Sequence, residues 1–324
     1  MDDLYKNLHA EGVLSDESFS KTLQRQPPLF SLHWEIKTIL YLGVALLTAG
    51  LGALIYENID SIGHTFVLLL IALISAGCFA YCFKNKLPFS TEKVRAPNSA
   101  FDYVLLLASI SFLVFAGYLQ YQYNVFGSHY GMATFIPMVV LFFIAYYFDH
   151  LGILTMAIAN LAVWMGVSVT PKQLLLNYDF DSEKIIYTYL LLGVLLILAA
   201  YATQRFNVKK HFKFSYEHYG IHVAYISLLS GYFHFYQFPA AFIWILGLGL
   251  LSFIIYRDAF KNKSFYFLLL VVLYSYIAVS SLMVRAFIAI NNITALYLIL
   301  MYFIASGIAL ILLLISLNKK LKAA

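Results

Sequence analysis

The sequence predicts an all-α fold: a polytopic transmembrane helical bundle of about ten spans, with both termini in the cytoplasm. Of the 324 residues, 62% are hydrophobic and only 11% are charged, and the mean hydropathy is +0.80. A soluble domain carries about 25% charged residues, so this chain has too few polar groups for a water-facing surface. Uncharged stretches of roughly 20 residues, the length that crosses a bilayer as a helix, recur along nearly the whole chain. Lipid is therefore the expected solvent.

Ten uncharged segments define the expected spans. They are continuous and rich in Leu, Ile and Ala, without the alternation of a barrel strand, so we expect helices. No Asp, Glu, Lys or Arg falls inside any of them. The spans are residues 38–56, 65–83, 103–121, 131–148, 151–169, 185–203, 219–236, 240–256, 265–284 and 294–317.

The distribution of Lys and Arg orients these spans. Cytoplasmic connections of membrane proteins carry an excess of both residues. With the N-terminus inside, 18 of the 21 Lys and Arg residues fall in cytoplasmic segments, and only Lys172, Lys184 and Arg285 fall outside. The split predicts that both termini lie in the cytoplasm. It also explains the pI near 8.9 without a nucleic-acid partner.

A two-residue break, Asp149-His150, separates the fourth and fifth spans. Without it the two would merge into one apolar helix too long for a bilayer, and the basic KKHFK cluster (Lys209–Lys213) would face the exterior. We therefore predict a tight cytoplasmic hairpin at this break. Asp149 is a suitable cap for the start of the fifth helix.

Three regions follow from this topology. Residues 1–36 are predicted to be a cytoplasmic helical segment, residues 37–318 the ten-span domain, and residues 319–324 a basic cytoplasmic tail. In the first region, Gly12 ends one short helix and Ser15 is typical of the N-cap of a second. This pair is too small to hold its own core. It either docks on a membrane-protein partner or serves only to orient the chain.

The N-terminal part resembles a bacterial family of predicted membrane proteins of unknown function. The resemblance rests on LHAEGVLSDESF (Leu8–Phe19), on the Gly-rich first span, and on ENID (Glu57–Asp60) directly after it, where Ile59 replaces an expected Trp. It is concentrated in about the first 65 residues. It implies a short cytoplasmic helical segment joined to a multi-spanning body, and no activity.

The first outer loop holds weak candidates for a metal site. Glu57, Asp60 and His64 carry side chains that bind divalent cations or serve as acid and base. However, their spacing matches no recognised ligand motif, and Asn and Asp are common in turns. We interpret the loop as a capped turn, and expect no catalytic residue, metal or cofactor there.

Polar residues inside the spans are few. Asn160 falls near the middle of the fifth span, where an amide is costly unless it is paired. His222 lies in the seventh span one turn after His218, and His234 lies near the outer end of that span. Asn160, His222 and His234 are a possible intramembrane polar site. Hydrogen bonding between helices is the alternative that we favour.

Small residues predict where helices approach closely. Gly43, Gly50 and Gly52 line one face of the first span, and Gly247 and Gly249 lie in the eighth. Small side chains let membrane helices pack closely.

Two functions remain open for an inner-membrane, multi-pass protein with these features. The first is a non-catalytic accessory or scaffold component that binds a membrane partner through residues 1–36. The second is a facilitative transporter of a small, weakly polar solute, built as a five-plus-five inverted repeat. We find no catalytic motif such as HExxH or GxSxG, so we do not expect an enzyme.

Overall fold

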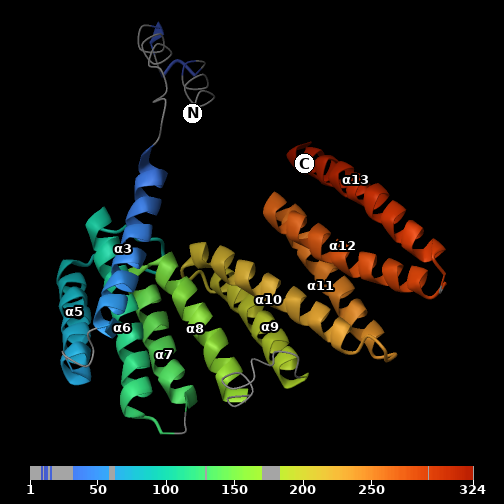
Figure 1. Cartoon of the computed structure of the whole chain (residues 1–324). Coiled ribbons are helices and arrows are strands. Elements are labelled where there is room, and N and C mark those ends of the chain that lie inside the picture. Colours follow the sequence, from blue (N-terminus) through green and yellow to red (C-terminus); the bar gives the residue numbers. More distant parts are fainter. Residues whose placement is uncertain are drawn as a thin grey trace. The chain divides into compact units, whose positions relative to one another are not determined.

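The computed structural model describes residues 9, 11–13, 15–16, 32–57, 63–127, 130–169, 183–290 and 292–323. The regular elements in these residues are helices, as the sequence predicts (Figure 1). The long helices are α3 Leu32–Glu57, α5 His64–Asn85, α6 Ser99–Tyr123, α7 Tyr130–Phe148, α8 Leu151–Val169, α9 Glu183–Arg205, α10 Lys213–His234, α11 Ala241–Lys261, α12 Phe265–Ile288 and α13 Thr294–Ala323. A short 3-10 helix, η2 Lys210–Phe212, precedes α10.

Each predicted span coincides with one of these long helices. Within the described residues, eight helices are long and apolar enough to cross a membrane: α5, α6, α7, α8, α9, α11, α12 and α13. Helix α3 contains a shorter apolar stretch, Thr38–Leu54, and α10 is not among the eight. Membrane crossing by α3 and α10 therefore stays a prediction.

The helices extend beyond the predicted spans into charged sequence. Lys213 and Glu217 lie in α10, Asp258 and Lys261 lie in α11, and Arg285 lies in α12. These charged residues lie outside the predicted spans but inside the longer helices. A helix satisfies its own backbone hydrogen bonds, so it can continue through the headgroup layer, where charged side chains are solvated.

A tight turn joins α7 to α8 as predicted, but its cap is not the predicted residue, and its cytoplasmic location stays a prediction. Helix α7 ends at Phe148 and α8 begins at Leu151. The backbone N–H of Ile153 donates to Nδ1 of His150 at 3.1 Å, so His150 caps α8. Asp149 has a left-handed backbone, with φ of 61°, and its carboxylate binds groups outside this hairpin. The two-residue turn uses His150 for the cap and leaves Asp149 available for other contacts.

The chain divides into two compact units, residues 1–70 and 71–324, with the boundary inside α5. In the second unit, consecutive helices pack side by side from α6 to α13 (Figure 1). One core lies among α6, α7, α8 and α9, with Leu105, Leu141 and Leu154 fully buried. A second core lies among α10, α11 and α12. Its buried residues include Tyr225 and Leu268.

The closest helix contacts occur at glycines other than those predicted. A Cβ atom on Gly193 of α9 would lie 2.7 Å from the backbone nitrogen of Ala224 in α10, and one on Gly231 would meet the ring of Trp244 at 2.3 Å. By contrast, Gly43, Gly50, Gly52 and Gly249 have open space where a Cβ would lie, and only Gly247 has a neighbour, Leu228 at 3.1 Å. Composition alone identified small residues, but the crossing points of helices decide which of them are needed.

Much of the predicted cytoplasmic segment lies outside the described residues. Gly12 has φ of +72°, which suits the predicted end of a short helix. Nε2 of His9 lies 2.8 Å from Oδ1 of Asp16. Helix α3 begins at Leu32, inside the predicted 1–36 segment. The division of the chain into three regions otherwise stays a prediction.

Candidate functional site

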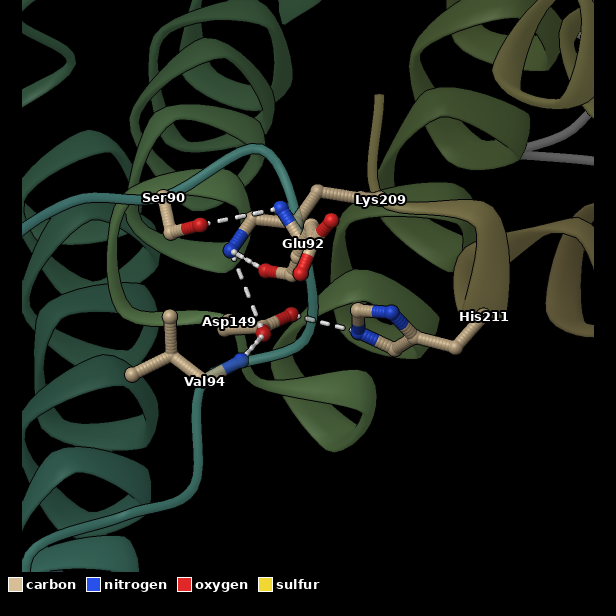
Figure 2. A network of polar contacts seen from close by, with 6 residues as sticks. All are labelled: Ser90, Glu92, Val94, Asp149, Lys209 and His211. Atoms are coloured by element: carbon tan, nitrogen blue, oxygen red, sulfur yellow. Dashed lines mark hydrogen bonds and ion pairs between the residues drawn. The ribbon is translucent and has the colours of Figure 1, made fainter. Parts of the chain in front are cut away.

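A buried cluster of charged side chains joins three connections at one end of the second unit. Asp149 lies between α7 and α8, whereas Lys209 and His211 lie between α9 and α10. Oδ2 of Asp149 is 3.2 Å from Nζ of Lys209, and Oδ1 is 2.5 Å from Nε2 of His211 (Figure 2). The side chains of Asp149 and Lys209 are each only 1% exposed. We call Asp149, Lys209 and His211 the end cluster.

The end cluster also fastens the connection between α5 and α6. The backbone N–H of Val94 donates to Oδ2 of Asp149 at 2.5 Å, and Nζ of Lys209 donates to the carbonyl oxygen of Glu92 at 3.2 Å (Figure 2). The backbone N–H of Lys209 donates to the carbonyl oxygen of Thr91 at 2.7 Å. A buried charge is costly unless it is paired and hydrogen-bonded. Here each buried charge has both kinds of partner, so the cluster fixes the connections relative to one another.

Two polar recesses flank this end of the molecule. One, of about 430 Å³, is lined by Thr91, Glu92, Lys93, Asn207, Lys210 and His211. The other, also about 430 Å³, is lined by Tyr201, Gln204, Arg205, Asn207, Asp258, Lys261 and Asn262. Asn207 belongs to both, so the recesses are adjacent. Basic side chains outnumber acidic ones in each, which favours acidic or otherwise polar binding partners.

A second polar arrangement, the histidine–tyrosine chain, links α10 to α12. It consists of His218, Tyr266, His222 and Tyr274. Oη of Tyr266 is 2.6 Å from Nδ1 of His218 and 3.1 Å from Nε2 of His222. Nδ1 of His222 is 2.7 Å from Oη of Tyr274. The four side chains therefore form one unbroken series of hydrogen bonds.

Further hydroxyl groups lie next to the deep end of this chain. The ring of Tyr225 stacks on that of Tyr274, with centroids 4.6 Å apart. Oη of Tyr225 is 2.9 Å from Oγ of Ser252, which is 3.1 Å from Oγ of Ser275. Ser275 lines an open groove of about 550 Å³ between α12 and α13. Tyr276, Tyr302 and Ser306 also line that groove.

A group of charged side chains lies at the start of α10, next to His218 in the sequence. Nζ of Lys213 is 3.2 Å from Oε1 of Glu217 and 3.8 Å from Oδ2 of Asp258. Burial raises the pKa of the Glu217 carboxyl, and nearby Lys213 opposes that rise only in part. This group of charges marks the α10 end that lies near the basic connections.

The structure separates the intramembrane residues singled out from the sequence. His222 belongs to the histidine–tyrosine chain. Nε2 of His234, at the other end of α10, is 3.8 Å from Oε1 of Glu183. Asn160 is a half-buried residue of α8, and no hydrogen bond joins its amide to another group in the described part of the chain. His222 and His234 lie about 18 Å apart along α10 at 1.5 Å per residue, and the interhelical hydrogen bonding favoured for His222 is present.

The predicted outer-loop candidates are only partly described. Glu57 is the last residue of α3 and His64 is the first of α5, whereas Asp60 lies outside the described residues. In the part of the chain that the structure describes, no group of three or more His, Cys, Asp or Glu side chains is placed to hold a metal ion. Because Asp60 is not described, the expectation that this loop holds no metal stays a prediction.

Comparison with known proteins supports the membrane assignment. Residues 6–154 match a family described as "Predicted membrane protein (DUF2157)". The match is wider than the predicted 65 residues, since it reaches past the Asp149-His150 turn into α8, although it covers just under half of the chain. No curated protein and no solved structure matches the chain. Together with the apolar helices, the match identifies an integral membrane protein similar to a family of unknown function.

Proposed function

We propose that this protein is a non-catalytic scaffold or accessory component of the inner membrane. The observation that carries the proposal is the end cluster, in which Asp149 and Lys209 are buried and paired. A buried ion pair adds little net stability over an apolar pair, but it requires one geometry. Holding three connections in one geometry suits a surface that must be presented to a partner.

The recesses beside the end cluster carry the basic side chains that would contact a partner. Lys93, Lys210, Arg205 and Lys261 line them, and basic patches attract acidic partners over long range. Residues 1–36 are predicted to lie on the same cytoplasmic side as these recesses. We therefore propose a membrane-protein partner with an acidic cytoplasmic surface, bound by the recesses together with the N-terminal segment.

Site-specific photocrosslinking in native membranes tests this proposal. A photoreactive residue at Lys210 is expected to give one discrete protein adduct, which Lys93→Glu weakens and deletion of residues 1–25 removes. The matched control places the same residue at Phe238, an exposed position beyond the other end of α10, and should give no such adduct. An adduct pattern that is the same at both positions would refute the proposal.

The same membranes can distinguish a scaffold from a facilitative transporter when solute uptake is measured together with the Lys210 adduct. A carrier that uses Asn160 would lose solute uptake in Asn160→Leu while its amount in the membrane stays unchanged. A scaffold would keep its Lys210 adduct in that variant, because Asn160 lies in α8 away from the recess residues. Loss of uptake in Asn160→Leu, with no Lys210 adduct in the wild type, would replace the scaffold proposal by the carrier.

A further inference from the structure

The histidine–tyrosine chain contains more hydrogen bonds than are needed to hold α10 against α12. One hydrogen bond between α10 and α12 would satisfy one polar pair. Instead, imidazole and phenol groups alternate over four side chains, with consecutive donor–acceptor distances of 2.6, 3.1 and 2.7 Å. The His218 and His222 rings are also close to one another, with centroids 4.8 Å apart. Alternation of groups that each both donate and accept is the arrangement through which protons move.

The protons of this chain can be assigned from its hydrogen bonds. A neutral imidazole has one N–H donor and one bare nitrogen, and a phenol has one O–H. If Tyr274 donates to Nδ1 of His222, then Nε2–H of His222 donates to the oxygen of Tyr266. Tyr266 then donates to Nδ1 of His218, whose own proton lies on Nε2. All four groups are satisfied with every donor pointing the same way.

We propose that the histidine–tyrosine chain relays protons between the predicted cytoplasmic end of α10 and the middle of α12. A proton that reaches the Tyr274 oxygen displaces the phenol proton to Nδ1 of His222. Nε2 of His222 then passes its proton to Tyr266, which passes its own to Nδ1 of His218, and His218 releases the proton on Nε2. One proton enters, one leaves, and each O–H or N–H bond broken is replaced by one formed.

Both ends of the relay have suitable neighbours. At the shallow end, Glu217 adjoins His218 in the sequence of α10. Oε1 of Glu217 is 3.2 Å from Nζ of Lys213, which is 3.8 Å from Oδ2 of Asp258 in α11. At the deep end, the ring of Tyr225 covers Tyr274. Carboxylates near the surface exchange protons with water, whereas hydroxyl groups can pass them on. The relay therefore connects a charged surface to a hydroxyl-rich interior.

The polar residues of α12 continue the path towards the opposite side. From Tyr266 to Arg285 they cover about 28 Å at 1.5 Å per residue, close to the roughly 30 Å of a hydrocarbon core. Beyond Tyr274, two hydroxyl pairs join α12 to α13: Oη of Tyr276 is 3.0 Å from Oγ of Ser306, and Oγ of Ser280 is 3.0 Å from Oη of Tyr302. We assign the second half of the path to these hydroxyl groups.

Proton flux into vesicles containing the purified full-length protein tests the relay. The vesicles hold a pH-sensitive dye, and potassium with valinomycin sets the membrane potential. The wild type is expected to acidify the vesicles faster than protein-free vesicles do. His222→Gln keeps a donor and an acceptor but cannot gain a proton on one side and lose one from the other, so its rate should fall to that of protein-free vesicles. Tyr274→Phe should do the same.

Tyr189→Phe is the matched control, because it removes a tyrosine hydroxyl that bonds the carbonyl oxygen of Ala162 at 3.2 Å, away from the relay. Its flux should equal that of the wild type. If His222→Gln does not fold, Tyr266→Phe makes the same test at the shared hydroxyl. Wild-type flux no faster than in protein-free vesicles, or folded relay variants with wild-type flux, would overturn the relay. The scaffold proposal does not depend on either result, since its test is the Lys210 adduct.

Discussion

Asp149→Asn is the sharpest test of the end cluster. Asparagine has nearly the same shape as aspartate and tolerates a left-handed backbone, so the turn at φ of 61° keeps its conformation. The amide oxygen still accepts one hydrogen bond, but Lys209 loses its counter-charge while its side chain stays 1% exposed. Removing one partner of a buried pair costs about 3–5 kcal/mol. Because the carbonyl oxygen of Glu92 still binds Lys209, we expect about 3 kcal/mol.

Equilibrium unfolding in mixed detergent micelles, followed by circular dichroism, measures this loss. Adding Lys209→Met to Asp149→Asn removes the stranded charge, so the double variant should be more stable than Asp149→Asn alone. Asn262→Ala is the control: it removes an exposed hydrogen bond to Asp258 in α11, and such surface changes usually stay within about 0.5 kcal/mol. An Asp149→Asn variant within about 0.5 kcal/mol of the wild type, the range of ordinary surface changes, would refute the reasoning.

Three other predictions concern packing, titration and topology. Gly193→Leu places a side chain against the backbone of α10 and should destabilise the fold by about 1–3 kcal/mol or more, whereas Gly249→Leu, in open space, should not; thermal unfolding in detergent compares them. Burial raises the pKa of the Glu217 carboxyl, so the folded state binds its proton more tightly than the unfolded state does. The resulting stabilisation is complete below the unfolded pKa and is lost as the pH rises through the folded pKa. Glu217→Gln should remove this loss when the free energy of unfolding is measured against pH. In a cysteine-free background, Lys210→Cys and Phe238→Cys should be labelled from opposite sides if α10 crosses the membrane, and labelling of both from one side would contradict the predicted topology.

The helices could be predicted from the sequence because each one depends on local pattern. An uncharged stretch of about 20 residues specifies a membrane helix whatever its neighbours are. The break at Asp149-His150 was predictable for the same reason, since bilayer thickness excludes one merged helix. The helix ends were not, because a helix continues into charged sequence, as α10 does at Lys213. Hydropathy marks the edge of the hydrocarbon rather than the edge of the helix.

The candidate sites could be predicted only in part. The spacing of His218 and His222 placed both rings on one helix face, but their partners, Tyr266 and Tyr274, are more than 40 residues away and have no local signal. Asp149 was predicted to cap a helix because the local sequence shows only its position at the break between two spans. Its contacts with Lys209 and His211 arise only when three connections meet at one end, which one sequence cannot reveal.

Helices α13 and α10 differ in both hydropathy and burial, and that difference explains why α10 falls outside the apolar set. Helix α13 is the most apolar candidate span, yet none of its apolar window is buried; it packs chiefly on α12 and leaves the rest of its surface to lipid. Helix α10 instead packs against both α9 and α11 and bonds to α12 through its histidines. A helix surrounded by protein can carry polar groups because other helices, not lipid, must satisfy them. Its weaker hydropathy is therefore what we expect of an interior membrane helix.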